Sequence, residues 1–146
     1  MDEKDPLVLE RQVCFALSIA ARSVVAIYRP LLEPMGLTHP QYLVMLALWQ
    51  RSPLSGKELA GLLALDPGTL TPLLKRLEAT GYLRRERHRD DERSLAVTLT
   101  EAGRALRERA LLIPPRVVAT LGMSIPELED LHASLTRVIA AAKQES

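Results

Sequence analysis

Cysteine and aromatic residues are both scarce in this sequence of 146 residues. The single cysteine, Cys14, excludes any disulfide within the chain. Aromatic residues make up 3% of the chain, so the core must be built mostly from leucine, alanine and valine. Because that mixture favours helices over sheets, we expect a mainly α-helical fold.

Long apolar runs and targeting signals are also missing from the sequence. No apolar run approaches the roughly 20 residues that span a bilayer. The N-terminus, MDEKDPLVLE, is acidic and lacks the basic and apolar regions of a signal peptide. We therefore expect a cytoplasmic protein with no membrane partner.

The sequence offers little that an enzyme or a metal site would need. His39, His88 and His132 lie in separate segments, without the Cys or carboxylate spacing of a zinc site. No phosphate-binding glycine loop is present. A cysteine hydrolase built on Cys14 and His39 would lack a third group and an oxyanion site. We therefore expect no catalytic activity, no metal and no cofactor.

Charge is nearly balanced overall, but it is not evenly distributed. The formal net charge is +1, whereas residues 68–89 hold six basic and two acidic side chains. The rest of the chain then holds 13 basic and 16 acidic residues. A basic block on a near-neutral body is typical of a phosphate-binding surface, although a solvated charged face would look the same.

Capping and turn residues divide the first half of the chain into helices. Apolar residues at helical spacing predict a helix from about Leu7 to Leu32, ended by residues 33–36. Thr38 and Gln41 form a capping box for the next helix, which residues 51–53 close. Ser55 and Glu58 repeat this signature, and a short amphipathic stripe follows. Residues 65–68 then form a turn.

A further helix, a hairpin and two more helices follow that turn. Pro72 is tolerable only near a helix start, so this helix must begin near Gly68, and Gly81 ends it. Alternating residues then predict strands at 82–87 and 95–99, joined by a polar turn. The next helix opens at residues 100–101, is broken or kinked by two prolines at 114–115, and precedes another capping box at 124–127.

This order of elements predicts a winged helix-turn-helix, mainly α with a small β-hairpin wing. We expect one domain over residues 1–146, with a DNA-binding lobe at 38–99. The helices at 7–33 and 101–143 are long and apolar on one face, which favours pairing with a second copy.

The second helix of a helix-turn-helix enters the major groove, with its N-terminal residues nearest the bases. Near the bases we expect Gly68, Thr69, Thr71 and Pro72, whose hydroxyl groups and carbons suit base edges, phosphates and thymine methyls. Two further groups of basic residues would face DNA. Lys75 and Arg76 lie in the next turns of the helix. Beside the hairpin tip lie Arg87, Arg89 and Arg93, whose guanidinium groups a narrow minor groove would attract.

The segment LDPGTLTPLLKRLEATGYLRRERHRDDERSLAVTLTEAG resembles the MarR family of winged-helix repressors. The preceding segment, RQVCFALSIAARSVVAIYRPLLEPMGLTHPQYLVMLALW, resembles its OhrR branch, whose members sense organic hydroperoxides. The resemblance covers nearly the whole chain. It implies a cytoplasmic homodimer that binds an inverted repeat of double-stranded DNA, with Arg93 in a minor groove and Asp91 bracing the wing against Arg76.

In that branch a cysteine near the N-terminus is the sensor, and Cys14 matches it. A thiolate attacks the peroxide and becomes sulfenic acid, and Tyr28 matches a tyrosine that stabilises it. This chain has His39 and Ser18 where two further tyrosines are common. His39 would serve as a thiolate partner if protonated, or would be only a polar surface residue. With no second cysteine, the chain is similar to the one-cysteine members of the branch.

The two sensor residues cannot meet within one chain. Cys14 and Tyr28 are 14 positions apart on one expected helix, a rise of about 21 Å. Any contact should therefore come from Tyr28 of a second copy, in a dimer interface.

Two alternatives remain open from the sequence. In the first, the protein is a MarR-type repressor controlled by a small ligand, such as a phenolic acid, and Cys14 only packs. In the second, it is a winged-helix interaction module that never touches DNA, against which the basic helix and wing argue.

Overall fold

The computed structural model describes residues 5–9, 12–87 and 95–144. Its elements follow in chain order: α1 (Val13–Leu32), η2 (Glu33–Met35), α2 (His39–Gln50), β1 (Leu54–Ser55), α3 (Gly56–Leu63), α4 (Pro67–Thr80), β2 (Leu83–Arg87), β3 (Leu95–Leu99), α5 (Glu101–Ala110), α6 (Ile113–Leu121) and α7 (Ile125–Gln144). The chain divides into two compact units, Met1–Leu111 and Leu112–Ser146, of which the first holds the helix-turn-helix and the sheet.

The predicted helix starts at 38, 55 and 124 are confirmed. Thr38 and Ser55 each accept a hydrogen bond from the backbone N–H three residues on, and Gln41 and Glu58 return the bond. Ser124 and Glu127 exchange the same pair of bonds before α7. These local bonds satisfy amide groups that the first turn leaves without helical partners, which is why the helices begin there.

Helix α4 begins at Pro67 and ends at Thr80, just before Gly81, as its prolines and glycine predict. Asp66 caps it through a 2.9 Å bond from the Thr69 N–H. Pro72 is the sixth residue of this helix, just beyond the first turn, so its missing N–H costs the one helical bond to the Gly68 carbonyl. Gly81 has φ of 95°, a left-handed conformation that suits glycine.

One expectation for the first helix, its start, is wrong. The helix begins at Val13, not Leu7, because the backbone of Gln12 is extended, with φ of −76° and ψ of 116°, and separates α1 from the turn in which the Leu7 N–H bonds the Asp5 carboxylate. Val13–Met35 is also long and apolar enough, by length and composition alone, to cross a membrane, with a mean hydropathy of 1.4. Only 6% of that window is buried, and such a helix equally suits burial in an assembly.

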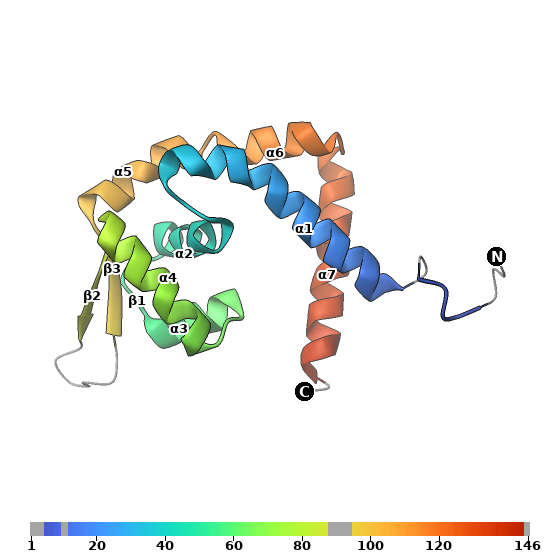
Figure 1. Ribbon diagram of the computed structural model, residues 1–146, viewed down its shortest axis with the longest axis horizontal. Helices are drawn as coiled ribbons and strands as arrows, with labels where there is room; N and C mark the ends of the chain where they lie inside the picture. Colours follow the sequence, from blue (N-terminus) through green and yellow to red (C-terminus); the bar gives the residue numbers. More distant parts are fainter. Residues whose placement is uncertain (1–4, 10–11, 88–94, 145–146) are drawn as a thin grey trace. The chain divides into compact units, whose positions relative to one another are not determined.

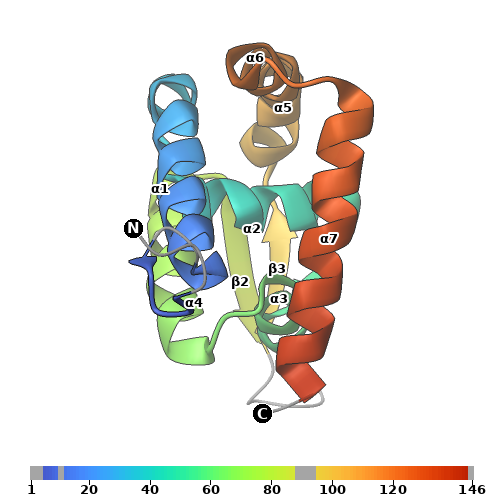
Figure 2. The same cartoon turned by 90° about the vertical axis from the view of Figure 1, so that its right-hand side faces the viewer.

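The sheet has three strands in the order β1–β3–β2, so the expected hairpin is present but gains one strand. Leu83 pairs with Leu99 and Arg87 with Leu95 in the antiparallel β2–β3 ladder. The two-residue strand β1 pairs Leu54 with Val97 on the other edge. In Figure 1 the hairpin lies beside α4, and Figure 2 shows the same strands with α2 and α3.

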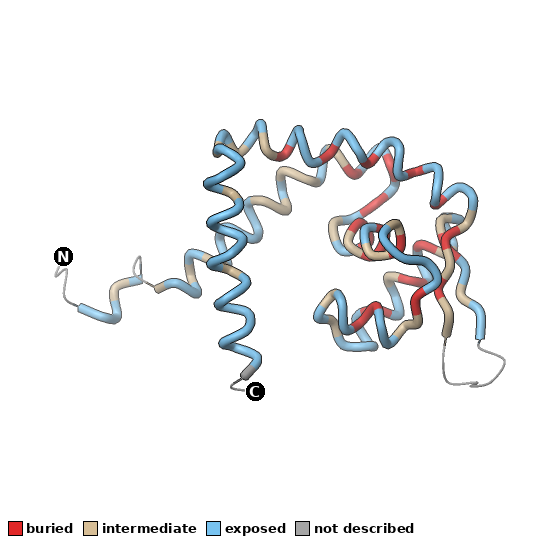
Figure 3. Tube along the Cα trace, turned by 180° about the vertical axis from the view of Figure 1, so that it is seen from behind, coloured by how far each residue is buried: buried red, intermediate tan, exposed pale blue. Residues whose placement is uncertain are grey.

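The core of the first unit lies where α2, α3, α4 and the sheet meet. Its fully buried side chains are mostly leucine, as the composition predicts: Leu32, Val44, Met45, Leu48, Leu54, Leu59, Leu77, Leu83 and Val97. Figure 3 shows buried segments in these elements, whereas most of α1 and α7 is exposed. The core therefore packs α4 against α2, α3 and the sheet, while α1 and α7 keep apolar residues exposed.

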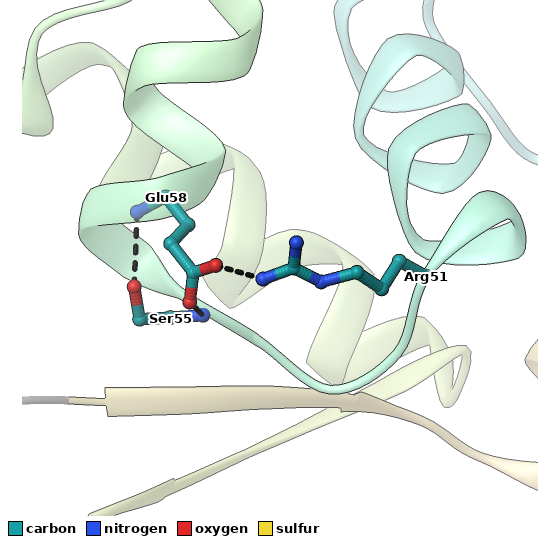
Figure 4. Close-up of polar contacts among 3 residues, drawn as sticks. All are labelled: Arg51, Ser55 and Glu58. Carbon is teal, nitrogen blue, oxygen red and sulfur yellow. Dashed lines mark hydrogen bonds and ion pairs between the residues drawn. The ribbon is translucent and has the colours of Figure 1, made fainter.

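A polar bridge also joins the two helices that precede α4. The Arg51 guanidinium, at the end of α2, pairs with the Glu58 carboxylate in α3. Figure 4 shows that the same carboxylate accepts the Ser55 N–H, 3.1 Å away. Hydrogen bonds from Ser55, with a contribution from Arg51, hold the pKa of Glu58 below its usual value. Glu58 therefore caps α3 and ties its start to the end of α2.

Candidate nucleic-acid interface and sensor residues

One face of α4 is buried and the opposite face is free for a partner. Leu70, Leu74 and Leu77 are buried, and Leu73 is half-buried. The predicted contact residues are all exposed: Gly68, Thr69, Thr71, Pro72, Lys75 and Arg76. The spacing of the leucines thus turns both cations and both threonines outward.

The polar atoms of the first turn of α4 are engaged within the protein. Thr69 Oγ1 donates to Asp66 Oδ2 over 3.0 Å, and Thr71 Oγ1 donates to the Pro67 carbonyl over 2.8 Å. Hydrogen bonds from the Thr69 backbone and side chain hold the pKa of Asp66 below its usual value. This turn therefore presents oxygen acceptors and methyl groups, and positive charge begins with Lys75.

Not all of the basic block is available to a partner. Arg85, in β2, donates from Nε and Nη2 to Glu78 Oε1, at 3.2 and 2.9 Å. Its backbone N–H also bonds Glu78 Oε2, and these bonds lower the pKa of Glu78. The sequence pattern missed this pair, although an acidic residue seven positions before an arginine was visible. Arg85 therefore fastens α4 to the wing, and Arg84 and Arg87 remain exposed.

Three predicted wing residues, Arg89, Asp91 and Arg93, lie outside the described residues, as does the proposed contact between Asp91 and Arg76.

Cys14 lies in the first turn of α1 and is exposed. Tyr28 is 14 residues further along the same helix, about 21 Å of rise, so one protomer cannot bring the two side chains together.

Tyr28 and His39 lie together, as parts of one aromatic cluster. Their ring centroids are 5.0 Å apart in an edge-on arrangement, and Tyr42 lies 5.7 Å from Tyr28. Burial raises the pKa of Tyr28 and lowers that of His39. Burial therefore disfavours the protonated form of His39, while the neutral ring still offers an N–H donor.

A surface hollow of about 300 Å³ opens beside this cluster. It is lined by Val25, Arg29, Glu33, Leu37, Thr38, His39 and Pro40. Apolar, basic and acidic side chains all border it, so a small molecule with a polar group could occupy it. Among the described residues, no group of three or more His, Cys, Asp or Glu side chains is arranged to hold a metal ion.

Comparisons with known proteins agree on one class of protein, transcriptional regulators. The family model for the transcriptional regulator SarA/Rot matches residues 26–109. The chain is 49% identical over 131 residues to the HTH-type transcriptional regulator TtmR of Methylorubrum extorquens, covering 90% of this chain and 67% of TtmR. It is 39% identical over 142 residues to the organic hydroperoxide resistance transcriptional regulator of Bacillus subtilis, covering 97% of both chains.

Solved structures show the same fold. Reduced AbfR bound to DNA, a Staphylococcus epidermidis protein, matches with a TM-score of 0.77 and 31% identity. The match covers 92% of this chain and 94% of that one. These relatives are transcriptional regulators, not enzymes, and their fold is the mainly helical winged helix described above. The chain therefore belongs to the MarR family of winged-helix transcriptional regulators and is similar to its organic hydroperoxide resistance regulators.

Proposed function

We propose that this regulator is a cytoplasmic repressor that binds operator DNA through α4 and releases it when Cys14 is oxidised by an organic hydroperoxide. The observation that carries the DNA-binding part is the exposed face of α4, which presents Lys75 and Arg76 opposite a stripe of three buried leucines and one half-buried leucine. A helix of this kind fits a major groove.

The proposed orientation on DNA follows from the distribution of polar groups on the DNA-binding lobe, residues 38–99. The first turn of α4, with Gly68, Thr69, Thr71 and Pro72, faces base edges, because its acceptors and methyls suit amino groups and thymine. Lys75 and Arg76 neutralise phosphates. Arg87, Arg89 and Arg93 carry the wing toward the minor groove, and two copies of the head on a homodimer read an inverted repeat.

The switch is a two-electron oxidation of sulfur. The Cys14 thiolate attacks the terminal oxygen of the hydroperoxide, the O–O bond breaks, and sulfur keeps that oxygen as sulfenic acid. The alkoxide that leaves takes a proton and departs as an alcohol. Sulfur is oxidised and the peroxide is reduced, so no other redox partner is needed for this step.

The sensor site needs both protomers of a dimer. Tyr28 and His39 of one protomer form a pair of rings, and Cys14 of the other protomer is the thiol that would reach them. A phenol and a neutral imidazole can each donate a hydrogen bond to a thiolate. The sulfenic acid then requires an external thiol, a backbone nitrogen, a cysteine of another chain or further oxidation, because Cys14 is the single cysteine.

Electrophoretic mobility shift on the promoter region of its own gene tests the switch. Cumene hydroperoxide should weaken binding of the wild type by tenfold or more, within the range of about 5- to 150-fold of known couplings. The Cys14→Ser variant should bind equally with and without oxidant. Ser18→Ala, changed one helical turn away, is the matched control and should respond like the wild type. Release of Cys14→Ser by the hydroperoxide, or no release of the wild type, would contradict the sensor proposal.

A pair of arginine variants tests the docking. Arg76→Ala should weaken DNA binding and lower the slope of log affinity against log salt by about one, because one phosphate contact is lost. Arg85→Gln should instead lower thermal stability and leave the salt slope unchanged, since its guanidinium bonds Glu78. Equal salt slopes for wild type and Arg76→Ala would count against this orientation of α4.

The hollow beside His39 favours a second candidate, in which a small ligand such as a phenolic acid controls DNA binding. Cys14→Ser would then keep its response to the ligand. Calorimetric titration of wild type and Cys14→Ser with salicylate separates the two candidate functions. If both proteins bind salicylate equally tightly and both then release DNA, the result supports the ligand-controlled repressor.

A further inference from the structure

The turn between α1 and α2 is held by two side chains from distant parts of the sequence, one just before β2 and one in α5. The Tyr82 hydroxyl donates to the Met35 carbonyl over 2.7 Å, across 47 positions of sequence. The Arg109 guanidinium, from α5, donates to the Pro34 carbonyl over 3.1 Å. Both acceptors belong to η2, which directly follows α1, the helix that carries Cys14 and Tyr28.

The backbone of Tyr82 also connects the end of α4 to the start of α5. Its N–H bonds the Leu77 carbonyl and so closes the end of α4. Its carbonyl accepts the Thr100 N–H, at the start of α5, and lies so close to Gly103 that a Cβ there would approach it to 2.0 Å. One residue therefore joins the recognition helix, the first strand of the wing and α5, while its hydroxyl reaches the turn after α1.

The attachment of α1 to the rest of its unit makes this contact important. Leu32 is the one fully buried residue among Val13–Leu32, and it lies at the end of the helix next to η2. Movement of α1 therefore reaches the rest of its unit by two routes: its last turn with η2, and the packing of Tyr28 against the rings of α2. The Met35 carbonyl is the point of η2 that is bonded to Tyr82, two residues after the end of α4.

From this geometry we infer that Tyr82 is a positioning residue that couples the state of α1 to the orientation of α4 and the wing. The inference rests on the proposed redox function. Oxidation of Cys14 displaces α1, η2 moves with it, and the hydrogen bond to Met35 transmits the displacement to the end of the recognition helix. Without the hydroxyl, the head keeps its DNA-binding orientation when α1 moves.

The test is the ratio of the DNA dissociation constants of the oxidised and reduced protein. Tyr82→Phe keeps the ring, so its reduced form should bind DNA within about threefold of wild type. Its oxidised-to-reduced ratio should be lower than that of the wild type by about three- to tenfold, the size that one neutral hydrogen bond supports. Thr80→Val removes a hydroxyl bond to the Arg76 carbonyl inside α4 and should keep the wild-type ratio.

The possible outcomes distinguish a failure of the Tyr82 coupling from a failure of the proposed redox function. A wild-type ratio in Tyr82→Phe, with normal release of the wild-type protein, overturns the role of Tyr82 alone. No release of the wild type by the hydroperoxide overturns the redox function and this coupling together. If Tyr82→Phe does not fold, Tyr82→Leu also removes the hydroxyl from this half-buried position, and a wild-type ratio in that variant overturns the proposal.

Discussion

His39 illustrates how its surroundings determine the chemistry of one residue. It is the first residue of α2, where the positive end of the helix dipole disfavours a cation. Its ring packs against Tyr28 and Tyr42, and Arg29 and Glu33 border the same hollow. Burial lowers its pKa, so the neutral imidazole is the form that the fold selects.

We predict that protonation of His39 destabilises the fold. A histidine whose folded pKa lies below its unfolded value of 6.5 binds more protons when unfolded, so stability falls as pH drops below about 6.5. The difference in unfolding free energy between wild type and His39→Gln, measured with urea from pH 7.5 to 5, should decrease toward acid. The carboxylates whose pKa is lowered act at lower pH and are shared by both proteins. Parallel curves would show that His39 does not titrate differently in the two states.

The junction of α5 with the wing depends on one close approach. Gly103 accepts no side chain, since a Cβ would lie 2.0 Å from the Tyr82 carbonyl oxygen and 3.2 Å from Leu99. Its N–H bonds Thr100 Oγ1, and its carbonyl accepts the Trp49 indole N–H over 2.9 Å. Helix α5 thus reaches both α2 and the sheet at its first turn.

We therefore expect Gly103→Ala to destabilise the protein by about 1–3 kcal/mol, because the backbone of Tyr82 must shift to admit the methyl group. Gly61→Ala is the matched control. It lies inside α3 with no atom within 4 Å of the added Cβ, so it should stabilise the fold by up to about 1 kcal/mol. Urea unfolding of both variants measures the two effects, and equal stabilities would contradict the packing at Gly103.

The elements that sequence reasoning predicted correctly depend on local chemistry. Thr38, Ser55 and Ser124 cap their helices through partners three residues away, and Pro72 restricts the start of α4 to the two turns before it. Strand β1 was missed, because two residues carry no periodicity and pair with Val97 far along the chain. Ala64 ends α3 with φ of 54°, a conformation that a glycine would have signalled and an alanine does not.

In the candidate site, too, local features could be predicted from the sequence and contacts between distant residues could not. The helical spacing of the leucines in α4 identified its exposed face, and the basic block identified its charge. The bond of Arg85 to Glu78 and that of Tyr82 to Met35 join separate elements. Only the folded chain could show that Arg85 is engaged within the protein and that Tyr82 reaches the turn after α1.

At the scale of the whole molecule, the long helices carry more exposed apolar surface than a monomer would keep. In α1, Val13 and Ile19 are exposed, and in α7 Val138 and Ile139 are 46% and 54% exposed. The stripe of α7 recurs at helical spacing, which favours its packing on another helix. We take a second copy of the chain as its partner, because two reading heads on one dimer can bind both halves of an inverted repeat.

We predict that Val138→Glu breaks this dimer without unfolding the protomer, since the side chain is nearly half exposed in the single chain. Sedimentation velocity should show a monomer, and operator affinity should fall by about a hundredfold or more, because each head then binds alone. Ala133→Glu places the same charge on the opposite face of α7 and should remain dimeric. A dimeric Val138→Glu with wild-type affinity would show that the α7 stripe lies outside the interface, and the two heads would then have to be joined through another surface.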